Sequence, residues 1–296
     1  MHVSVLLQEV IESLAPRVGG SFVDATFGGG GHSRHIASLI GLGGRLIAFD
    51  ADESVFNDTI VGEIRSHTNF IPVVGNFRTM REELRKHGNV PLDGVIFDLG
   101  LSSTQLEESG RGFSFQRDEP LAMTFAHAPR ADDVTAERVV NEWSEESLAT
   151  ILRGFGEERF ARSIATHIVE ARKVHPITST AQLVEVIHQS TPGWYQRGRT
   201  HFATRTFQAI RMAVNDELGA IEAGIAGVLP YMKSGGRLAV ISFHSIEDRL
   251  VKQRFRQLSE DGVVNILTKK PISPSENELT ANPRARSAKL RVVQKN

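Results

Sequence analysis

The sequence contains no cysteine among its 296 residues. A chain without thiols forms no disulfide and supplies neither a thiolate nucleophile nor the cysteine ligands of zinc fingers and iron–sulfur clusters. Long apolar runs are also missing, because no segment approaches the ~20 consecutive apolar residues that a membrane-spanning helix needs. The opening segment carries Glu9 and Glu12, where a signal peptide would stay apolar. These absences predict a cytoplasmic protein with no membrane partner and no redox or thiol chemistry.

The net charge is close to zero but is unevenly distributed. Over the whole chain it is −1, whereas residues 233–296 hold 13 Lys and Arg against 6 Asp and Glu. A basic end on a nearly neutral protein favours a partner that carries phosphate, although solvated tails are also often basic. Hydrophobic residues make up 40% and charged residues 23%, so the composition is that of a globular protein.

Short apolar runs alternate with amphipathic stretches in the first hundred residues, which predicts a parallel sheet with crossover helices. The expected strands there are 21–26, 45–49, 69–74 and 94–99, with helices at 32–40, 53–66 and 78–87. The pattern resumes with a helix at 204–231, a strand at 237–243, a helix at 245–258 and strands at 263–268 and 288–293. Seven strands, the last two placed to pair as a hairpin, predict an α/β fold: the doubly wound, Rossmann-like sheet of the methyltransferase type.

The region between these two halves has a different pattern. Residues 104–203 contain no convincing strand but several helical stretches, at 133–143, 144–154, 157–173 and 180–190. We therefore expect a discontinuous sheet domain, formed by 1–103 and 204–296, and an inserted helical domain at 104–203.

The strongest local signal is the segment DATFGGGGH, residues 24–32, where a strand is expected to turn into a helix. Glycines there let the backbone approach a ligand, and the amino end of the helix offers free N–H groups. A dinucleotide fingerprint is incomplete because Ser33 stands at its third glycine position, and no Walker lysine follows. The acid Asp24 before the glycines suits a ligand with an ammonium group, such as S-adenosylmethionine. The alternative is a plain tight turn.

Three further residues follow the ends of expected strands. Asp50 closes the second strand, where an acidic side chain commonly accepts hydrogen bonds from ribose hydroxyls, and Asp52 is its near competitor. Phe77 follows the third strand and could pack on an adenine ring or belong to the core. Asp98 closes the fourth strand at the switch region of the sheet, which makes it the best candidate to face both cofactor and substrate.

A histidine and two basic segments are further candidates for function. His244, at the end of the fifth strand, could be a general base or a helix cap, and no metal-ligand spacing supports a metal site. Basic residues gather in 197–211 and 282–291, and aromatic residues lie close to the first of these clusters. Cations mixed with aromatic rings are typical of grooves that bind single-stranded nucleic acid, although solvated helix faces have the same composition.

Several segments together resemble the ribosomal RNA small subunit methyltransferase H family. They are DATFGGGGHS (24–33), DGVIFDLGLSSTQLEESGRGFSF (93–115), GEERFARSIA (156–165), ATRTFQAIRMAVNDEL (203–218), ISFHSIEDRLVK (241–252) and NPRARSAKLR (282–291). They cover nearly the whole chain in the family's order. The resemblance implies S-adenosylmethionine-dependent methylation of the exocyclic N4 of a cytidine in the decoding region of bacterial 16S rRNA, within the small ribosomal subunit. It also implies that the inserted helical domain lies on the substrate side.

The resemblance also assigns residues. It implies that the cofactor contacts are Gly30, Gly31, His32, Asp50, Phe77, Asp98 and Gln105. For methyl transfer we expect Asp98, or a backbone carbonyl in residues 98–102, to act as the catalytic acceptor from the amino group of a flipped or single-stranded cytosine. We expect the RNA phosphates to be held by Arg199, Arg205, Arg249, Arg284 and Arg286.

One segment departs from the family pattern. Residues 120–126 read PLAMTFA, where the family typically has PLDMRMD. Two alternatives therefore stay open. One is a non-catalytic ribosome assembly or RNA-binding factor with a relict cofactor site, and the other is a methyltransferase that acts on another acceptor.

Overall fold

The computed structural model describes residues 4–101, 106, 109–127 and 132–296. They form two compact units. One unit contains the chain up to Gly100 together with Leu218–Asn296, and we call it the sheet unit; the other is Leu101–Glu217, the helical unit. In the described part of the chain, no helix combines the length and apolar character needed to cross a membrane.

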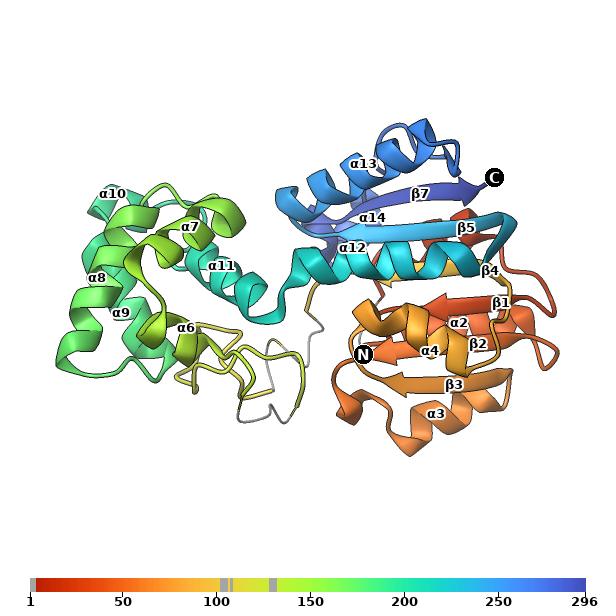
Figure 1. Cartoon of the computed structure of the whole chain (residues 1–296), viewed down its shortest axis with the longest axis horizontal. Coiled ribbons are helices and arrows are strands. Elements are labelled where there is room, and N and C mark those ends of the chain that lie inside the picture. Colours follow the sequence, from red (N-terminus) through yellow and green to blue (C-terminus); the bar gives the residue numbers. More distant parts are fainter. Residues whose placement is uncertain (1–3, 102–105, 107–108, 128–131) are drawn as a thin grey trace. The chain divides into compact units, whose positions relative to one another are not determined.

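The sheet unit is built on one seven-stranded sheet with the order β3-β2-β1-β4-β5-β7-β6 (Figure 1). The strands are β1 Ser21–Asp24, β2 Arg45–Asp50, β3 Asn69–Val74, β4 Leu92–Asp98, β5 Met232–Ser242, β6 Val264–Ile266 and β7 Lys289–Lys295. Strands β1 to β5 are parallel, and β7 runs antiparallel to both β5 and β6. The predicted doubly wound, Rossmann-like α/β fold is confirmed.

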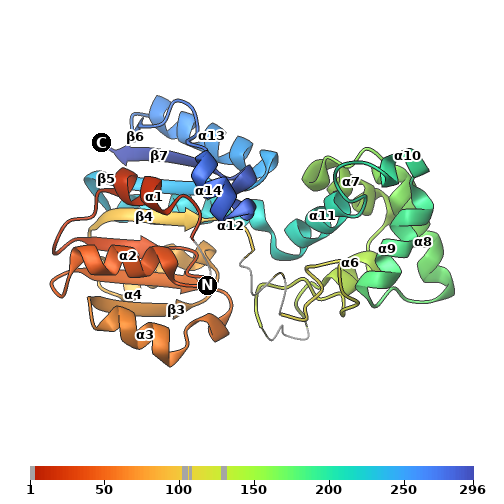
Figure 2. The same cartoon turned by 180° about the vertical axis from the view of Figure 1, so that it is seen from behind.

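Helices cover both faces of this sheet because successive strand residues point to opposite sides. In β1, Val23 packs into the core beneath α4 Met80–Lys86, α12 Glu217–Val228 and α13 Ser245–Glu260 (Figure 1). Its neighbour Phe22 packs into the opposite core. That core is closed by α1 Leu7–Leu14, α2 Gly31–Ile40 and α3 Asp58–Arg65 (Figure 2). Both faces of the central strands are therefore dry, which explains their nearly continuous apolar runs.

The strand order reverses beside β1. The chain runs outward from β1 to β2 and β3, and then returns to place β4 on the other side of β1. In open parallel sheets, ligands bind at the carboxyl ends of the strands beside such a reversal. The β1–β4 edge is therefore the place where a site is expected.

The helical unit has a core of its own. Its helices are α6 Ala136–Glu142, α7 Glu145–Gly156, α8 Ala161–Val174, α9 Thr180–Ser190, α10 Gly193–Gln196 and α11 Thr204–Asn215. Leu121 and Met123, from the irregular segment before α6, are buried among them. This segment is held through its backbone: Asn215 Nδ2 donates to the carbonyl of Met123, and Arg111 Nη1 donates to the carbonyl of Phe125. The altered 120–126 segment is thus part of the helical core.

The prediction of a single helix at 204–231 is wrong. It is broken at Asp216, whose φ of 44° is left-handed, so that α11 ends at Asn215 and α12 begins at Glu217. Helix α11 buries Phe207 and Ile210 in the helical unit. The division between the units accordingly falls after Glu217, whereas the sequence placed it after residue 203.

Candidate active site

Most of the predicted cofactor residues gather at the carboxyl edge of the parallel strands. Asp50 ends β2, Asp98 ends β4, and Phe77 follows β3. Gly30 and His32 lie at the amino end of α2, directly after β1. Because these four strands are neighbours in the sheet, their ends bring the side chains together beside the β1–β4 reversal.

The glycine loop forms a tight left-handed turn into α2. Gly30 has a φ of 71°, and a Cβ there would lie 2.9 Å from the ring of Phe27. A Cβ on Gly31 would overlap the hydroxyl of Ser4. Both glycines are therefore needed for the packing of the chain itself. Among the described residues no side chain caps α2, so the N–H groups of its first turn remain available to an anionic group.

Asp24 stabilises this loop from inside. Its side chain is buried, and its two oxygens accept hydrogen bonds from Ser33 Oγ at 2.7 Å and from the backbone N–H of Thr26 at 3.1 Å. Thr26 Oγ1 in turn accepts from the backbone N–H of Asp98 at 2.7 Å. Burial raises the pKa of Asp24. The acid that the sequence suggested as a partner for an ammonium group is thus engaged in fixing β1 against β4.

Asp50 and Asp52 have different roles, which sequence position alone leaves undecided. Asp50 accepts the backbone N–H of Gly28 at 2.8 Å and that of Asp52 at 2.9 Å, one at each carboxylate oxygen. Asp52 instead caps the next turn and accepts from the backbone and hydroxyl of Ser54. Burial raises the pKa of Asp50 to about 6, although the two backbone N–H groups oppose the shift. Each oxygen of Asp50 keeps a second lone pair for a ligand hydroxyl.

His32 and Asp98 face each other across the β1–β4 edge. His32 Nε2 lies 3.5 Å from Asp98 Oδ2, and the imidazole is buried. Neither His32 Nδ1 nor Asp98 Oδ1 has a hydrogen-bond partner among the described residues. Burial favours neutral His32, but the carboxylates of Asp98, Asp24 and Glu278 outweigh it and raise the pKa of His32. The site therefore holds a buried acceptor atom, Asp98 Oδ1, beside an imidazole that readily becomes cationic.

Phe77 is partly core and partly exposed. Its ring meets Phe97 edge to face, with centroids 5.3 Å apart and an interplanar angle of 84°. A Cβ on Gly224 of α12 would lie 2.9 Å from both rings, so this helix packs closely on them. The remainder of the Phe77 ring is exposed. Gln105, the seventh predicted cofactor contact, lies outside the described residues.

The predicted RNA-binding arginines are all exposed but belong to both units. Arg199 and Arg205 lie in the helical unit, and Arg205 Nη1 donates to the carbonyl of Glu157 at 3.1 Å. The other three, Arg249, Arg284 and Arg286, lie in the sheet unit. Two of the five thus belong to one unit and three to the other.

The motif ISFHSIEDRLVK proves to be largely structural. His244 caps α13: its Nδ1 accepts the backbone N–H of Glu247 at 3.3 Å, which favours the cap over a general base. Within the same motif, Asp248 forms a buried bidentate ion pair with Arg291, at 2.7 and 3.2 Å, and also contacts Lys289. These cations lower the pKa of Asp248 against the opposing effect of burial. Sequence reasoning missed this pair, because nothing in the spacing links α13 to β7.

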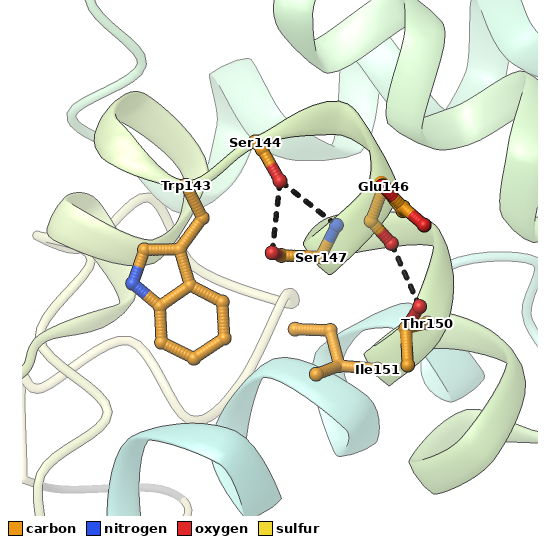
Figure 3. Close-up of a pocket in the computed structure, with 6 residues that line it drawn as sticks. All are labelled: Trp143, Ser144, Glu146, Ser147, Thr150 and Ile151. Carbon is orange, nitrogen blue, oxygen red and sulfur yellow. Dashed lines mark hydrogen bonds between the residues drawn. The ribbon is translucent and has the colours of Figure 1, made fainter.

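A separate depression of about 710 Å³ lies on the helical unit around the amino end of α7 (Figure 3). Trp143 and Ile151 line it together with Ser144, Glu146, Ser147 and Thr150. The hydroxyls are already used locally: Ser144 Oγ donates to Ser147 Oγ, and Thr150 Oγ1 donates to the carbonyl of Glu146. None of the predicted site residues lines this depression.

Comparison with known proteins identifies the family of the chain. The model of the MraW methylase family matches residues 1–296. A ribosomal RNA small subunit methyltransferase H from Brevibacillus brevis is 44% identical, over 99% of this chain and 98% of that protein. Proteins of the same name from a Paenibacillus species and from Symbiobacterium thermophilum are 42% and 43% identical, each over 99% of this chain and over 99% and 96% of their own lengths. The chain belongs to the MraW methylase family.

Proposed function

We propose that this methyltransferase transfers a methyl group from S-adenosylmethionine to the exocyclic N4 of a cytidine in the 16S rRNA of the small ribosomal subunit. The observation that carries the proposal is the Asp98 carboxylate, whose buried Oδ1 has no partner among the described residues and which ends β4 beside the strand-order reversal. The names of the relatives support ribosomal RNA as the substrate. The choice of cytidine N4 rests on the family resemblance of the sequence.

The chemistry of the residues at this edge fits S-adenosylmethionine. That molecule offers hydroxyl and ammonium donors, one carboxylate and a flat apolar purine. The edge offers acceptors at Asp50 and Asp98, uncapped N–H donors at the start of α2, and the partly exposed ring of Phe77. Arg34, which lies beside the glycine loop, donates to the carbonyl of Gly29 and pairs with Glu63, so its guanidinium is engaged locally. The amino end of α2 would hold the carboxylate, Asp50 the ribose hydroxyls and Phe77 the adenine.

When bound, S-adenosylmethionine supplies a methyl group on a positively charged sulfur. The amino group of cytosine is a weak nucleophile because its lone pair is delocalised into the ring. Asp98, whose side chain is 21% exposed, would accept a hydrogen bond from that amino group, localise the lone pair on nitrogen and take the proton that N4 loses. His32, whose Nε2 lies 3.5 Å from Asp98 Oδ2, would help to hold the carboxylate in place.

The RNA would be held mainly through its phosphates. Arg249, Arg284 and Arg286 are exposed on the sheet unit, and Arg199 and Arg205 are exposed on the helical unit. Arginine binds phosphate strongly and without regard to base sequence, so these residues would position the strand, and the Asp98 carboxylate would select the base. A cytosine reaches Asp98 only when it is unpaired or flipped out of a helix.

A transfer assay with labelled S-adenosylmethionine tests this proposal. The acceptors are small subunits that lack the modification, naked 16S rRNA, DNA and bulk protein, each with the wild-type protein and with Asp98→Asn. We expect label in the subunits or the naked rRNA with the wild-type protein, and much less with the variant. Label found only in DNA or only in protein would show that the substrate is that molecule and not ribosomal RNA. Cofactor binding without transfer to any acceptor would favour a non-catalytic ribosome factor.

A further inference from the structure

The most exposed large aromatic side chain among the described residues is that of Trp194, which is 55% exposed. It stands on α10, the short helix Gly193–Gln196 of the helical unit. Its ring lies edge to face with Phe160, with centroids 5.7 Å apart, and with Tyr195 at 6.0 Å. The guanidinium of Arg159 lies over the Trp194 ring at 5.2 Å from the centroid. A large indole surface thus remains open to solvent beside a cation.

Hydrogen bonds around the Trp194 ring hold α10 in place. Glu158, which is 3% exposed, accepts the hydroxyl of Tyr195 at 2.7 Å and the backbone N–H of Phe160 at 2.8 Å. Gln196 Nε2 donates to the carbonyl of His188 at 2.7 Å, which ties α10 to the end of α9. Burial and Glu158 raise the pKa of Tyr195, so its hydroxyl stays a donor. Binding at Trp194 would cost little ordering of the protein.

The surroundings of Trp194 are positively charged. From residue 193 to residue 205 the sequence has three arginines, Arg197, Arg199 and Arg205, and no acidic residue. Arg197 folds back towards the start of α10, where a Cβ on Gly193 would lie 3.4 Å from its Nη1. Arg159 and Arg162, on the segment that packs against α10, are also exposed. Both carboxylate oxygens of the buried Glu158 accept hydrogen bonds from Tyr195 and Phe160. The exposed charge around the indole is therefore mainly cationic.

We propose that Trp194, with Arg159 and Arg197, forms a stacking subsite for one unpaired base of the RNA substrate. A rigid aromatic plane among arginines is the arrangement by which proteins hold single-stranded nucleic acid: the ring stacks on a base and the cations neutralise the adjacent phosphates. A neutral ligand would leave the arginines unused. This inference rests on the proposed RNA substrate and adds a contact on the helical unit that is separate from the residues at Asp98.

Tryptophan fluorescence tests the subsite directly, because the chain has only two tryptophans. In Trp143→Phe, Trp194 is the single reporter; in Trp194→Phe, only Trp143 reports. A single-stranded oligoribonucleotide of about ten residues is titrated into each variant at low salt. We expect saturable quenching in Trp143→Phe and none in Trp194→Phe. Trp194→Ala should weaken RNA binding about tenfold or more, whereas Val174→Ala, at another exposed apolar residue of the helical unit, should not.

The outcomes separate this inference from the proposed function. No quenching of Trp194, with RNA affinity unchanged in Trp194→Ala and methyl transfer intact, would overturn the subsite and leave the function standing. Protection of Trp194 from acrylamide by whole subunits but not by their RNA would assign the surface to a ribosomal protein instead, which also overturns it. Failure of the wild-type protein to bind RNA or to methylate subunits would remove the function itself.

Discussion

Asp50 should make cofactor binding depend on pH. Its pKa is raised by burial to about 6, well above the ordinary value of 3.8. Only the carboxylate offers full acceptor capacity to ribose hydroxyls, so protonation below that pKa should weaken binding. At about pH 7.5 roughly 97% of the groups are ionised, and at about pH 5 roughly 9%. The apparent Kd for S-adenosylmethionine should therefore rise about tenfold between the two, equivalent to ~1.4 kcal/mol.

Isothermal titration calorimetry across this range measures the effect, with circular dichroism to confirm that the protein stays folded. Asp50→Asn should bind weakly at every pH and lose this step in the profile. Asp52→Asn is the matched control: it removes a carboxylate two residues away that caps Ser54, and should keep the step. A wild-type profile that is flat, or a step that persists in Asp50→Asn, would refute the assignment of Asp50.

Three further predictions concern catalysis, stability and RNA binding. Asp98→Asn should lower the transfer rate by about 10²-fold or more while changing the Kd for cofactor much less; an equal loss in both would make Asp98 a cofactor ligand only. Asp248→Ala leaves the buried Arg291 without this carboxylate partner and should lower the free energy of unfolding by ~3–5 kcal/mol in urea titrations at neutral pH. Because the pKa of Asp248 is lowered in the folded protein, the stability it contributes should be present above about pH 4 and disappear in acid. Arg284→Ala and Arg286→Ala should each flatten the dependence of log affinity on log salt by about 0.7–0.9; an unchanged slope would exclude that phosphate contact.

Much of the sheet unit could be predicted from sequence for a physical reason. Parallel strands buried on both faces must be short, continuous apolar runs, and 45–49 is such a run. Once strands are located, Asp50 and Asp98 follow as residues at their carboxyl ends. The pairing of the last two strands with each other is confirmed by the β6–β7 ladder, although β6 is shorter than expected.

The features that could not be predicted from the sequence depend on contacts between distant residues or on a single backbone angle. The apolar periodicity continues from α11 into α12, so the left-handed turn at Asp216 leaves no mark in the pattern. Asp50 and Asp52 are both acids at one strand end, and only the hydrogen bond from Gly28 separates them. The ion pair between Asp248 and Arg291 joins α13 to β7, and no local rule predicts such a partner.

The identity of the methylated nucleoside tests the central claim most directly. Small subunits that lack the modification are incubated with the protein and labelled S-adenosylmethionine, and their RNA is digested to nucleosides and analysed by mass spectrometry. We predict a single labelled product, cytidine methylated at N4, which is absent when Asp98→Asn replaces the wild-type protein. Label on another nucleoside, or on a ring carbon or ring nitrogen of cytosine, would contradict the account, because the hydrogen-bond acceptor at Asp98 is assigned to an exocyclic amino group.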